Sequence, residues 1–439
     1  MTWTVSRRNL IRLGGVAATA ATLPAITACG AGKKKEAASP DSPLRMMWWG
    51  GDARTKAYQD ALAAYSRTHG TDPVKAEFSG YDGYFDKFDA DVAGGTAADI
   101  VQMDTALVTE YAGRSVLRPL DDYVGNRLDL SGFPAALLAA GTVGGKLYGV
   151  PSGTGGVLVT YDATMLRGVG VAAPRADWTW DGLAGYAAKV TKAFGGKVYG
   201  TSDGGGDDEG AFQIFLRQRG KDLYTTEGKL GFGAADLAEW LTYWDGLRKR
   251  HAAAPADVTS AAHNDSAKNP LIAGRTAVTF GTGLEISLPP LTQHDLDFVP
   301  VPAGPAGSVE GEYLSGGVLL SIYDRSGSAD AAADLIGYFA GDDQAIKIMG
   351  LTRGIPPTEK ARRIAAAQLG PAQQRALAAT DLVAARVAAA KTTAPPTPPK
   401  GASQVKELLF QNNLAVAFGR KTVAAAVESF LAGADSALA

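Results

Sequence analysis

The stretch after Pro43 alternates short apolar runs with segments of helical period, and this order constrains the fold most. "LRMMWW" and "ADIVQMD" are typical of buried strands, and "PVKAEFSG" is a third short strand between them. Two segments with helical spacing separate these strands, and each ends at glycine. The order strand–helix–strand–helix–strand predicts an α/β fold with mostly parallel sheets flanked by helices.

The length and composition limit what this fold can be. The 439 residues exceed what one hydrophobic core usually supports, so we expect two domains. With 46% hydrophobic and 20% charged residues, the chain is typical of a globular protein. A formal net charge of −2 with mixed signs gives no indication of a nucleic-acid partner or of a polybasic membrane surface.

The single cysteine, Cys29, follows an apolar run that is too short to span a membrane. "SRRNLIRLGG", with Arg7 and Arg8, resembles a twin-arginine export signal, and "ITAC" resembles the lipobox of bacterial lipoproteins. The resemblance implies a signal peptide over 1–28 and a diacylglycerol on Cys29, followed by a tether over 29–43. A plain secretory signal with a chance cysteine is the alternative. Removing 1–28 takes away three arginines and leaves 40 basic against 45 acidic side chains.

The rest of the chain repeats the α/β pattern. "GKLYGVPSGTGGVLVTYD" predicts strands around a glycine-rich centre, and Thr179 is a candidate N-cap. A stripe of Leu and Trp side chains in "AADLAEWLTYWDGLRKRH" predicts a core-facing helix, so we interpret Trp240 and Trp244 as core residues. "KVYGTSDGGGDDEG" predicts a strand that runs into a polar glycine loop, and "APPTPPKG" predicts an extended polyproline-type link.

The order of a dozen such pieces resembles a known family. "WWGG", "GYDGYFDKFDADVAGGTAADIVQMD", "GKLYGVPSGTGGVLVTYD", "WTWDGL", "AGRTAVTFGTG", "FVPVPAGPAG" and "RGIPP" follow one another over nearly the whole chain after the tether. Together they resemble the extracellular solute-binding proteins of ABC sugar importers, in the maltose-binding-like group. The resemblance implies the two-lobed periplasmic-binding-protein fold, with lobe 1 over 44–152 and 273–317 and lobe 2 over 153–272 and 318–439.

The same resemblance implies a function. Two lobes would close on a sugar or oligosaccharide, bending near Gly153 and Gly316, and deliver it to the permease subunits of an ABC transporter. The protein would be a monomer without cofactor or enzymatic activity. It would be held by the lipid on Cys29 at the outer face of the bacterial cell membrane. We expect no nucleic-acid partner.

The candidate ligand-binding residues follow from how sugars are recognised. Sugar rings stack on aromatic side chains and their hydroxyls need polar partners, and ligands bind beyond the carboxyl ends of parallel strands. Trp48 and Trp49 point to opposite faces of their strand, so we expect one in the core and the other at the ligand. The predicted ligand-binding residues are Trp49, Tyr84, Asp104, Asp207, Gly283, Glu285, Gly317 and Arg353.

Other motifs in the chain point to other chemistries. "GTSDG" fits the nucleophile elbow of serine hydrolases at Ser202, with Asp257 and either His263 or His294 as partners. A nucleophile elbow needs a packed helix directly after the serine, and none is expected after Ser202. An exported serine hydrolase is therefore the less favoured alternative function. "DGGGDDE" has carboxylates that could bind calcium, but it lacks the ligand spacing of known calcium loops. The sequence does not decide whether calcium binds there. The four histidines have no zinc-ligand spacing, and the glycines at 153–156 do not form a dinucleotide fingerprint.

Overall fold

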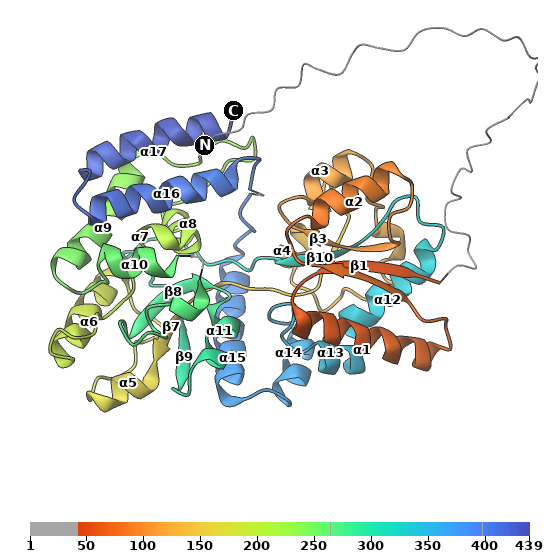
Figure 1. Cartoon of the computed structure of the whole chain (residues 1–439), viewed down its shortest axis with the longest axis horizontal. Coiled ribbons are helices and arrows are strands. Elements are labelled where there is room, and N and C mark those ends of the chain that lie inside the picture. The colour runs from red at the N-terminus through yellow and green to blue at the C-terminus, as the bar shows by residue number, and fades with distance from the viewer. Residues whose placement is uncertain (1–42, 264, 397) are drawn as a thin grey trace, which may run out of the picture. The chain divides into compact units, whose positions relative to one another are not determined.

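The computed structural model describes residues 43–263, 265–396 and 398–439. The predicted signal peptide, nearly all of the predicted tether, and Cys29 lie outside these residues. The described chain alternates helices and strands around two main sheets (Figure 1). None of its described helices combines the length and the apolar character needed to cross a lipid bilayer.

The first sheet has five strands in the order β2-β1-β3-β10-β6. They are β1 (Arg45–Trp49), β2 (Lys75–Ser79), β3 (Ile100–Asp104), β6 (Val150–Pro151) and β10 (Val318–Ile322). β1 pairs in parallel with both β2 and β3, as the order of elements predicts. β10 runs antiparallel to both β3 and β6.

Helices cover both faces of this sheet (Figure 1). They are α1 (Asp52–His69), α2 (Tyr84–Ala93), α3 (Val108–Gly113), α12 (Ala329–Gly341) and α13 (Asp343–Met349). Trp48 packs on the face covered by α1 and α12, and Trp49 packs on the face covered by α2 and α3. The prediction that they point to opposite faces is confirmed. Both are buried, because helices cover both faces of the strand.

The second sheet has three strands in the order β8-β7-β9. They are β7 (Val157–Asp162), β8 (Val278–Thr282) and β9 (Leu296–Pro300). β7 is antiparallel to both neighbours over five residue pairs each, which differs from the expected mostly parallel arrangement. The long connection between β7 and β8 can return a strand in either direction, so the order of elements does not determine strand direction here.

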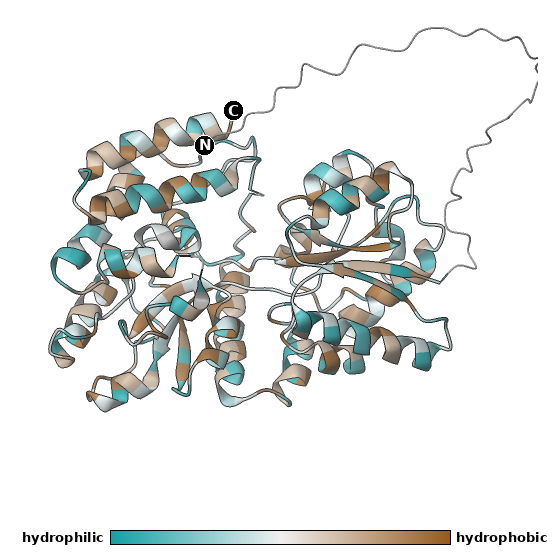
Figure 2. Ribbon diagram, viewed as in Figure 1, coloured by the Kyte–Doolittle hydropathy of each residue, from teal (hydrophilic) through white to brown (hydrophobic). Residues whose placement is uncertain are grey.

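Helices also pack around the second sheet. They are α5 (Ala163–Gly168), α6 (Trp180–Ala193), α7 (Gly204–Asp207), α8 (Glu209–Arg217), α9 (Ala234–Lys249), α10 (Ala256–Ala262), α11 (Leu284–Ser287), α15 (Pro371–Ala390), α16 (Ala402–Ala417) and α17 (Val423–Ala437). Trp240 and Trp244 on α9 are fully buried, and Thr179 Oγ1 accepts the Gly182 N–H at the start of α6, as expected. Figure 2 shows brown, apolar residues along the strands, and teal and brown residues mixed along the helices.

The pairing of strands differs from the predicted division into lobes. β8 and β9 lie within 273–317, assigned to lobe 1, but they pair with β7 of lobe 2. β10 lies in 318–439, assigned to lobe 2, but it pairs with β3 of lobe 1. The packing of the whole chain selects the partner of each strand, and spacing along the chain does not reveal that partner.

Three segments connect the two sheets and lie side by side. The Thr154 and Ile355 backbones exchange hydrogen bonds of 2.6 and 3.0 Å, and those of Gly155 and Ser315 exchange bonds of 3.3 and 2.8 Å. A Cβ at Gly153 would lie 2.0 Å from the Arg353 carbonyl oxygen, so only glycine fits there. The remaining elements are β4 (Thr142–Val143), β5 (Lys146–Leu147), α4 (Ala135–Ala139), α14 (Glu359–Ala366) and three short 3₁₀ turns over 121–123, 266–268 and 289–291.

Candidate functional site

A cavity of about 530 Å³ opens where β8 ends and α8 begins. The loop before β10, the end of α4, the start of α16 and residues of the proline-rich segment complete its wall. The lining side chains considered below are Thr105, Asp208, Glu209, Tyr224, Asp265, Phe280, Tyr313 and Lys406. This volume lies within the range of small-molecule sites in proteins.

Glycine allows the backbone to approach closely at two points of the cavity. A Cβ at Gly210 would lie 2.4 Å from Val157 Cγ2, so glycine lets the first turn of α8 lie against β7. Gly281 has φ of +156°, and a Cβ there would lie 2.6 Å from Leu284 Cδ1. These contacts place the residues that follow β8 and those that begin α8 around one space.

Three aromatic rings line the cavity. Tyr224 and Phe280 are buried, and Tyr313 is half-buried. The Tyr224 hydroxyl donates to Glu209 Oε1 at 3.3 Å. Burial, followed by the nearby Glu209 charge, raises the pKa of Tyr224, so this hydroxyl remains a donor at neutral pH. Such rings offer apolar faces to the C–H surfaces of a ligand.

Carboxylates lie beside these rings. Asp208 caps α8, because its Oδ1 accepts the Gly210 N–H at 3.0 Å. Burial raises the pKa of Glu209, and the nearby charge of Lys406 opposes that shift. Asp265 forms an ion pair of 3.1 Å with Lys268. Rings and carboxylates in one cavity can bind a ligand that has both apolar faces and hydroxyl donors.

The proline-rich segment forms part of the wall. Ala394, Pro395, Pro396 and Pro398 line the cavity, where the sequence predicts only an extended link. Arg217 holds the start of this segment, since its Nη2 donates to the Thr393 carbonyl at 2.6 Å. Only a tertiary contact could reveal this role, because α8 and the prolines are far apart in sequence.

The predicted residues of the first sheet lie together but do not line the cavity. Trp49 packs edge-on against Tyr81 and Tyr84, with ring centroids 5.4 and 5.0 Å apart. The Tyr84 hydroxyl is buried and donates to the carbonyls of Gln102 at 2.8 Å and Met47 at 3.2 Å. Their roles as ligand contacts stay predictions.

Asp104 and Tyr81 form the exposed part of this group. The Tyr81 hydroxyl donates to Asp104 Oδ2 at 3.1 Å, and Tyr81 is 51% exposed. Burial and the Asp104 charge raise the pKa of Tyr81 to about 12. Tyr81 was missed by the sequence analysis, although it precedes Tyr84 in the same aromatic run. Asp104 is followed directly by Thr105, which lines the cavity.

Glu285, Arg353, Gly283 and Gly317 also lie outside the described cavity lining. Glu285 is 1% exposed, its Oε2 has no hydrogen-bond partner, and burial raises its pKa to about 7. The Arg353 guanidinium is buried near the rings of Tyr58 and Phe339, at 5.8 and 5.2 Å from their centroids. Gly283 (φ +76°) begins α11, and Gly317 has φ of +51°. The side chain of Asp207 lies outside what the structure describes.

The glycine run after Ser202 differs from the expected polar loop. It forms the buried α7, where a Cβ at Gly205 would lie 2.5 Å from Asn413 Oδ1. Asp203, at the start of this helix, is buried and accepts hydrogen bonds from Arg248 at 2.7 Å and from Asn413 at 3.0 Å. Glycine is therefore needed for close packing against α16, and the Asp203 carboxylate is used within the protein.

The geometry around Ser202 does not form the predicted triad. Its Oγ accepts hydrogen bonds from the Thr279 hydroxyl at 3.2 Å and from the Phe280 N–H at 3.4 Å. His263 pairs with Glu407 at 3.3 Å, and His294 pairs with Asp162 at 2.6 Å. These contacts serve packing around the second sheet, and none of them favours a hydrolase.

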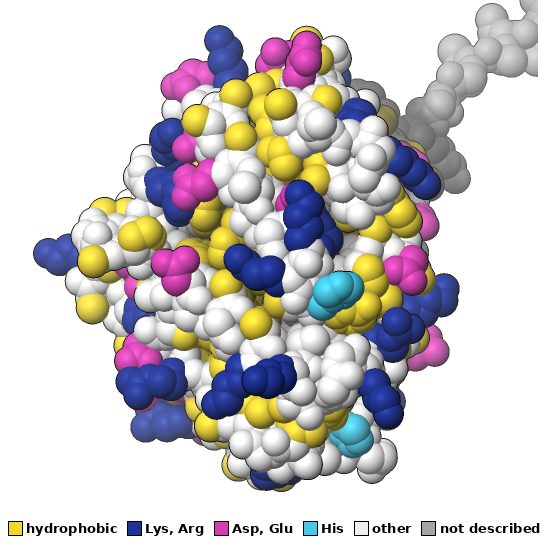
Figure 3. Space-filling model, turned by 90° about the vertical axis from the view of Figure 1, so that its left-hand side faces the viewer, with side chains coloured by type: hydrophobic (Ala, Val, Ile, Leu, Met, Phe, Trp, Pro, Cys, Tyr) yellow, Lys and Arg dark blue, Asp and Glu magenta, His cyan; other side chains and the backbone are white. Residues whose placement is uncertain are grey.

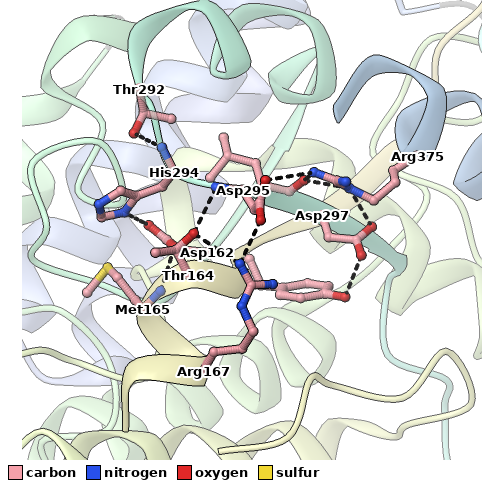
Figure 4. A network of polar contacts seen from close by, with 11 residues as sticks. Asp162, Thr164, Met165, Arg167, Thr292, His294, Asp295, Asp297 and Arg375 are labelled. Carbon is pink, nitrogen blue, oxygen red and sulfur yellow. Dashed lines mark hydrogen bonds and ion pairs between the residues drawn. The ribbon is translucent and has the colours of Figure 1, made fainter. Parts of the chain in front are cut away.

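The buried Asp162 and the half-exposed His294 belong to a polar network where β7 ends and β9 begins (Figure 4). Asp162 Oδ1 caps α5 by accepting the Met165 N–H at 2.8 Å, and Arg167 pairs with Asp295 at 2.6 Å. Arg375 on α15 donates two hydrogen bonds to the Leu296 carbonyl. These contacts hold α5 and α15 against the sheet.

Among the described residues, no group of three or more His, Cys, Asp or Glu could hold a metal ion.

A family model described as bacterial extracellular solute-binding protein matches residues 51–346. The chain belongs to this family. A binding protein of Brucella abortus (strain 2308) is 25% identical over 238 residues, which are 52% of this chain and 55% of the relative. This solute-binding protein thus spans about half the length of the curated relatives it matches.

Solved structures extend the similarity over the described chain. A family 1 extracellular solute-binding protein from Alicyclobacillus acidocaldarius has 26% identity and a TM-score of 0.78, covering 91% of this chain and 99% of its own. An oligogalacturonide-binding protein from Yersinia enterocolitica, in complex with saturated digalacturonic acid, has 24% identity and a TM-score of 0.72 over 90% and 98% of the two chains. A Listeria monocytogenes protein in complex with cycloalternan has 20% identity and a TM-score of 0.69 over 90% and 99%. These similarities confirm the two-lobed α/β fold.

Proposed function

We propose that this solute-binding protein captures a sugar or oligosaccharide in the cavity beside α8 and delivers it to the permease of an ABC transporter. The observation that carries the proposal is the combination of three rings with carboxylates in one cavity of about 530 Å³. A sugar-binding site needs aromatic faces on which the sugar ring stacks, and oxygen atoms that accept hydrogen bonds from the sugar hydroxyls. Two structural neighbours are complexes with oligosaccharides, which supports the same class of ligand here.

The connecting segments support a binding cycle without catalysis. We propose that the backbone near Gly153 and Gly316 bends as the lobes close on the ligand. Closure is stabilised only by a ligand that contacts the closed state more favourably than the open state. Thr105, which follows β3 of the first sheet, lines the same cavity as the residues of the second sheet, and this supports closure of both lobes on one ligand. The predicted lipid on Cys29 would hold the protein at the outer face of the membrane.

The test is a thermal-shift screen against mono- and oligosaccharides, followed by calorimetry on each hit. A ligand at 100 times its dissociation constant should add about 2.7 kcal/mol to the free energy of unfolding. Absence of a shift with every carbohydrate, combined with a shift for another solute class, would contradict the proposal. The anchor is tested separately, since Cys29→Ser should abolish incorporation of radiolabelled fatty acid.

A further inference from the structure

The charged side chains of the cavity are unequal in sign. The described lining contains three carboxylates, on Asp208, Glu209 and Asp265, and one ammonium, on Lys406. It includes no arginine among its described residues. Proteins usually bind carboxylate or phosphate groups through Arg or several Lys side chains. The cavity therefore offers few partners for a negatively charged ligand.

A helix N-terminus is the other common site for an anion, and α8 begins at this cavity. Asp208 already occupies that position, because its carboxylate accepts the Gly210 N–H at 3.0 Å. The positive end of the helix is thus compensated by a carboxylate of the protein itself. A ligand anion placed here would meet the negative charge of Asp208.

Lys406 is the one ammonium group among the described lining residues, and it lies near a carboxylate. Its charge opposes the effect of burial on the pKa of Glu209. Asp265 pairs with Lys268, but Lys268 is two-thirds exposed and lies outside the lining, so water screens its charge. Among the described lining residues, carboxylates therefore outnumber ammonium groups by three to one.

We infer that the cavity selects sugars without carboxylate groups and rejects uronates. This inference rests on the proposed function and specifies its ligand class. A neutral hydroxyl can donate to a cavity carboxylate, whereas a C6 carboxylate at the same place can only accept and adds a like charge. The ligand class therefore differs from that of the Yersinia neighbour, which was solved with saturated digalacturonic acid.

The experiment compares matched ligands that differ only at C6. Maltotriose, cellotriose, mannotriose and galactotriose are titrated by calorimetry at pH 8, each beside its counterpart oxidised to the uronate. We expect each neutral sugar that binds to do so at least tenfold more tightly than its uronate, which corresponds to about 1.4 kcal/mol. A uronate that binds as tightly as its neutral counterpart, or more tightly, overturns the inference and leaves the proposed function intact. Failure of all eight ligands to bind would instead count against the proposed function.

Variants connect the selectivity to the cavity carboxylates. Glu209→Gln and Asp265→Asn should each lower, severalfold, the ratio of the affinity for a neutral sugar to the affinity for its uronate. The reason is that each variant removes one negative charge at nearly constant shape. Glu239→Gln is the matched control, since Glu239 pairs with Arg219 outside the cavity lining, and its ratio should stay as in the wild type. An unchanged ratio in both cavity variants, with melting temperatures near that of the wild type, would overturn the inference.

Discussion

Several polar and aromatic side chains near the strand ends are buried in a core at the first sheet, but such side chains line a cavity at the second sheet. At the end of the first sheet, Trp49 and Tyr84 are buried, and the Tyr84 hydroxyl is satisfied by two backbone carbonyls. At the end of the second sheet, Tyr224 and Glu209 contact each other and line an open cavity.

A strand end can therefore bind a ligand only where helices leave it uncovered. α2 covers the end of β1 with Tyr84 and Phe88, so the aromatic side chains there form a core. Near the end of β8, Gly210 lets the first turn of α8 lie close to Val157, and Gly281 lets the end of β8 lie close to Leu284. The cavity lies beside these two glycines. Carboxyl ends of strands therefore indicate where to look, and packing decides which one is open.

The largest expected effect tests whether Trp49 belongs to a core. Trp49→Ala should lower the free energy of unfolding by about 3–5 kcal/mol, because it removes a buried ring packed against Tyr81 and Tyr84. Urea denaturation measures this loss. Phe78→Ala on the neighbouring strand is the control, since Phe78 is 52% exposed and should cost about 1 kcal/mol. Unchanged stability together with lost sugar binding would make Trp49 a ligand contact and break the comparison.

The second expected effect concerns pH. The pKa of Glu285 is raised by burial to about 7, so the folded state binds a proton more tightly than the unfolded state. Stability from this group is complete below about pH 4.5 and is lost as the pH rises to about 7, by roughly 3 kcal/mol. Glu285→Gln should remove this loss and raise stability at pH 8.

Denaturation curves between pH 4 and 8 measure that effect. Some slope should remain in Glu285→Gln, because burial also raises the pKa of Glu312 to about 7, while nearby Arg386 opposes that shift. Both carboxyls belong to the region of the second sheet. A wild-type slope that survives in the double variant Glu285→Gln/Glu312→Gln would place the titrating group elsewhere.

A third pair of variants makes the same chemical change in both regions. Tyr84→Phe should lower the free energy of unfolding by about 1–2 kcal/mol and leave ligand affinity unchanged, because its hydroxyl serves only backbone carbonyls. Tyr224→Phe should weaken ligand binding severalfold with a smaller effect on stability, because its hydroxyl and Glu209 line the cavity. Denaturation and calorimetry on both variants test this, and the reverse pattern would refute the comparison.

The smallest expected effect is spectroscopic. Asp104→Asn should lower the pKa of Tyr81 from about 12 without restoring its ordinary value, because burial is the larger cause of the shift. Ultraviolet titration of the tyrosines, compared with Tyr81→Phe, measures this change. If Asp104→Asn also weakens sugar binding tenfold, the site extends to the first sheet and the comparison must be revised.

Much of the fold could be predicted from the sequence. The apolar period of α9 indicated that Trp240 and Trp244 are buried, and strand alternation placed Trp48 and Trp49 on opposite faces. The order of helices and strands predicted the α/β class and, with the family resemblance, the two-lobed fold. On the face shown in Figure 3, basic and acidic side chains are interspersed, as expected from the mixed charge of the sequence.

The candidate site could be predicted only in part. The segments that end β3 and β8 were expected to border the ligand, and Thr105 and Gly281 of these segments line the cavity. The residues chosen within them do not, and the proline-rich segment was interpreted only as a link. Whether a side chain faces a cavity or a helix depends on neighbours that no local pattern specifies.

Features that depend on nearby residues could be predicted from the sequence alone. These are most of the strands and helices (α7 is an exception), the cap at Thr179, the buried stripe of α9 and the resemblance to solute-binding proteins. Only the tertiary structure decided which strands pair and where the cavity opens. The physical reason is that the cavity brings together residues from Thr105 to Lys406, and their contacts form only when the two sheets and their helices are packed.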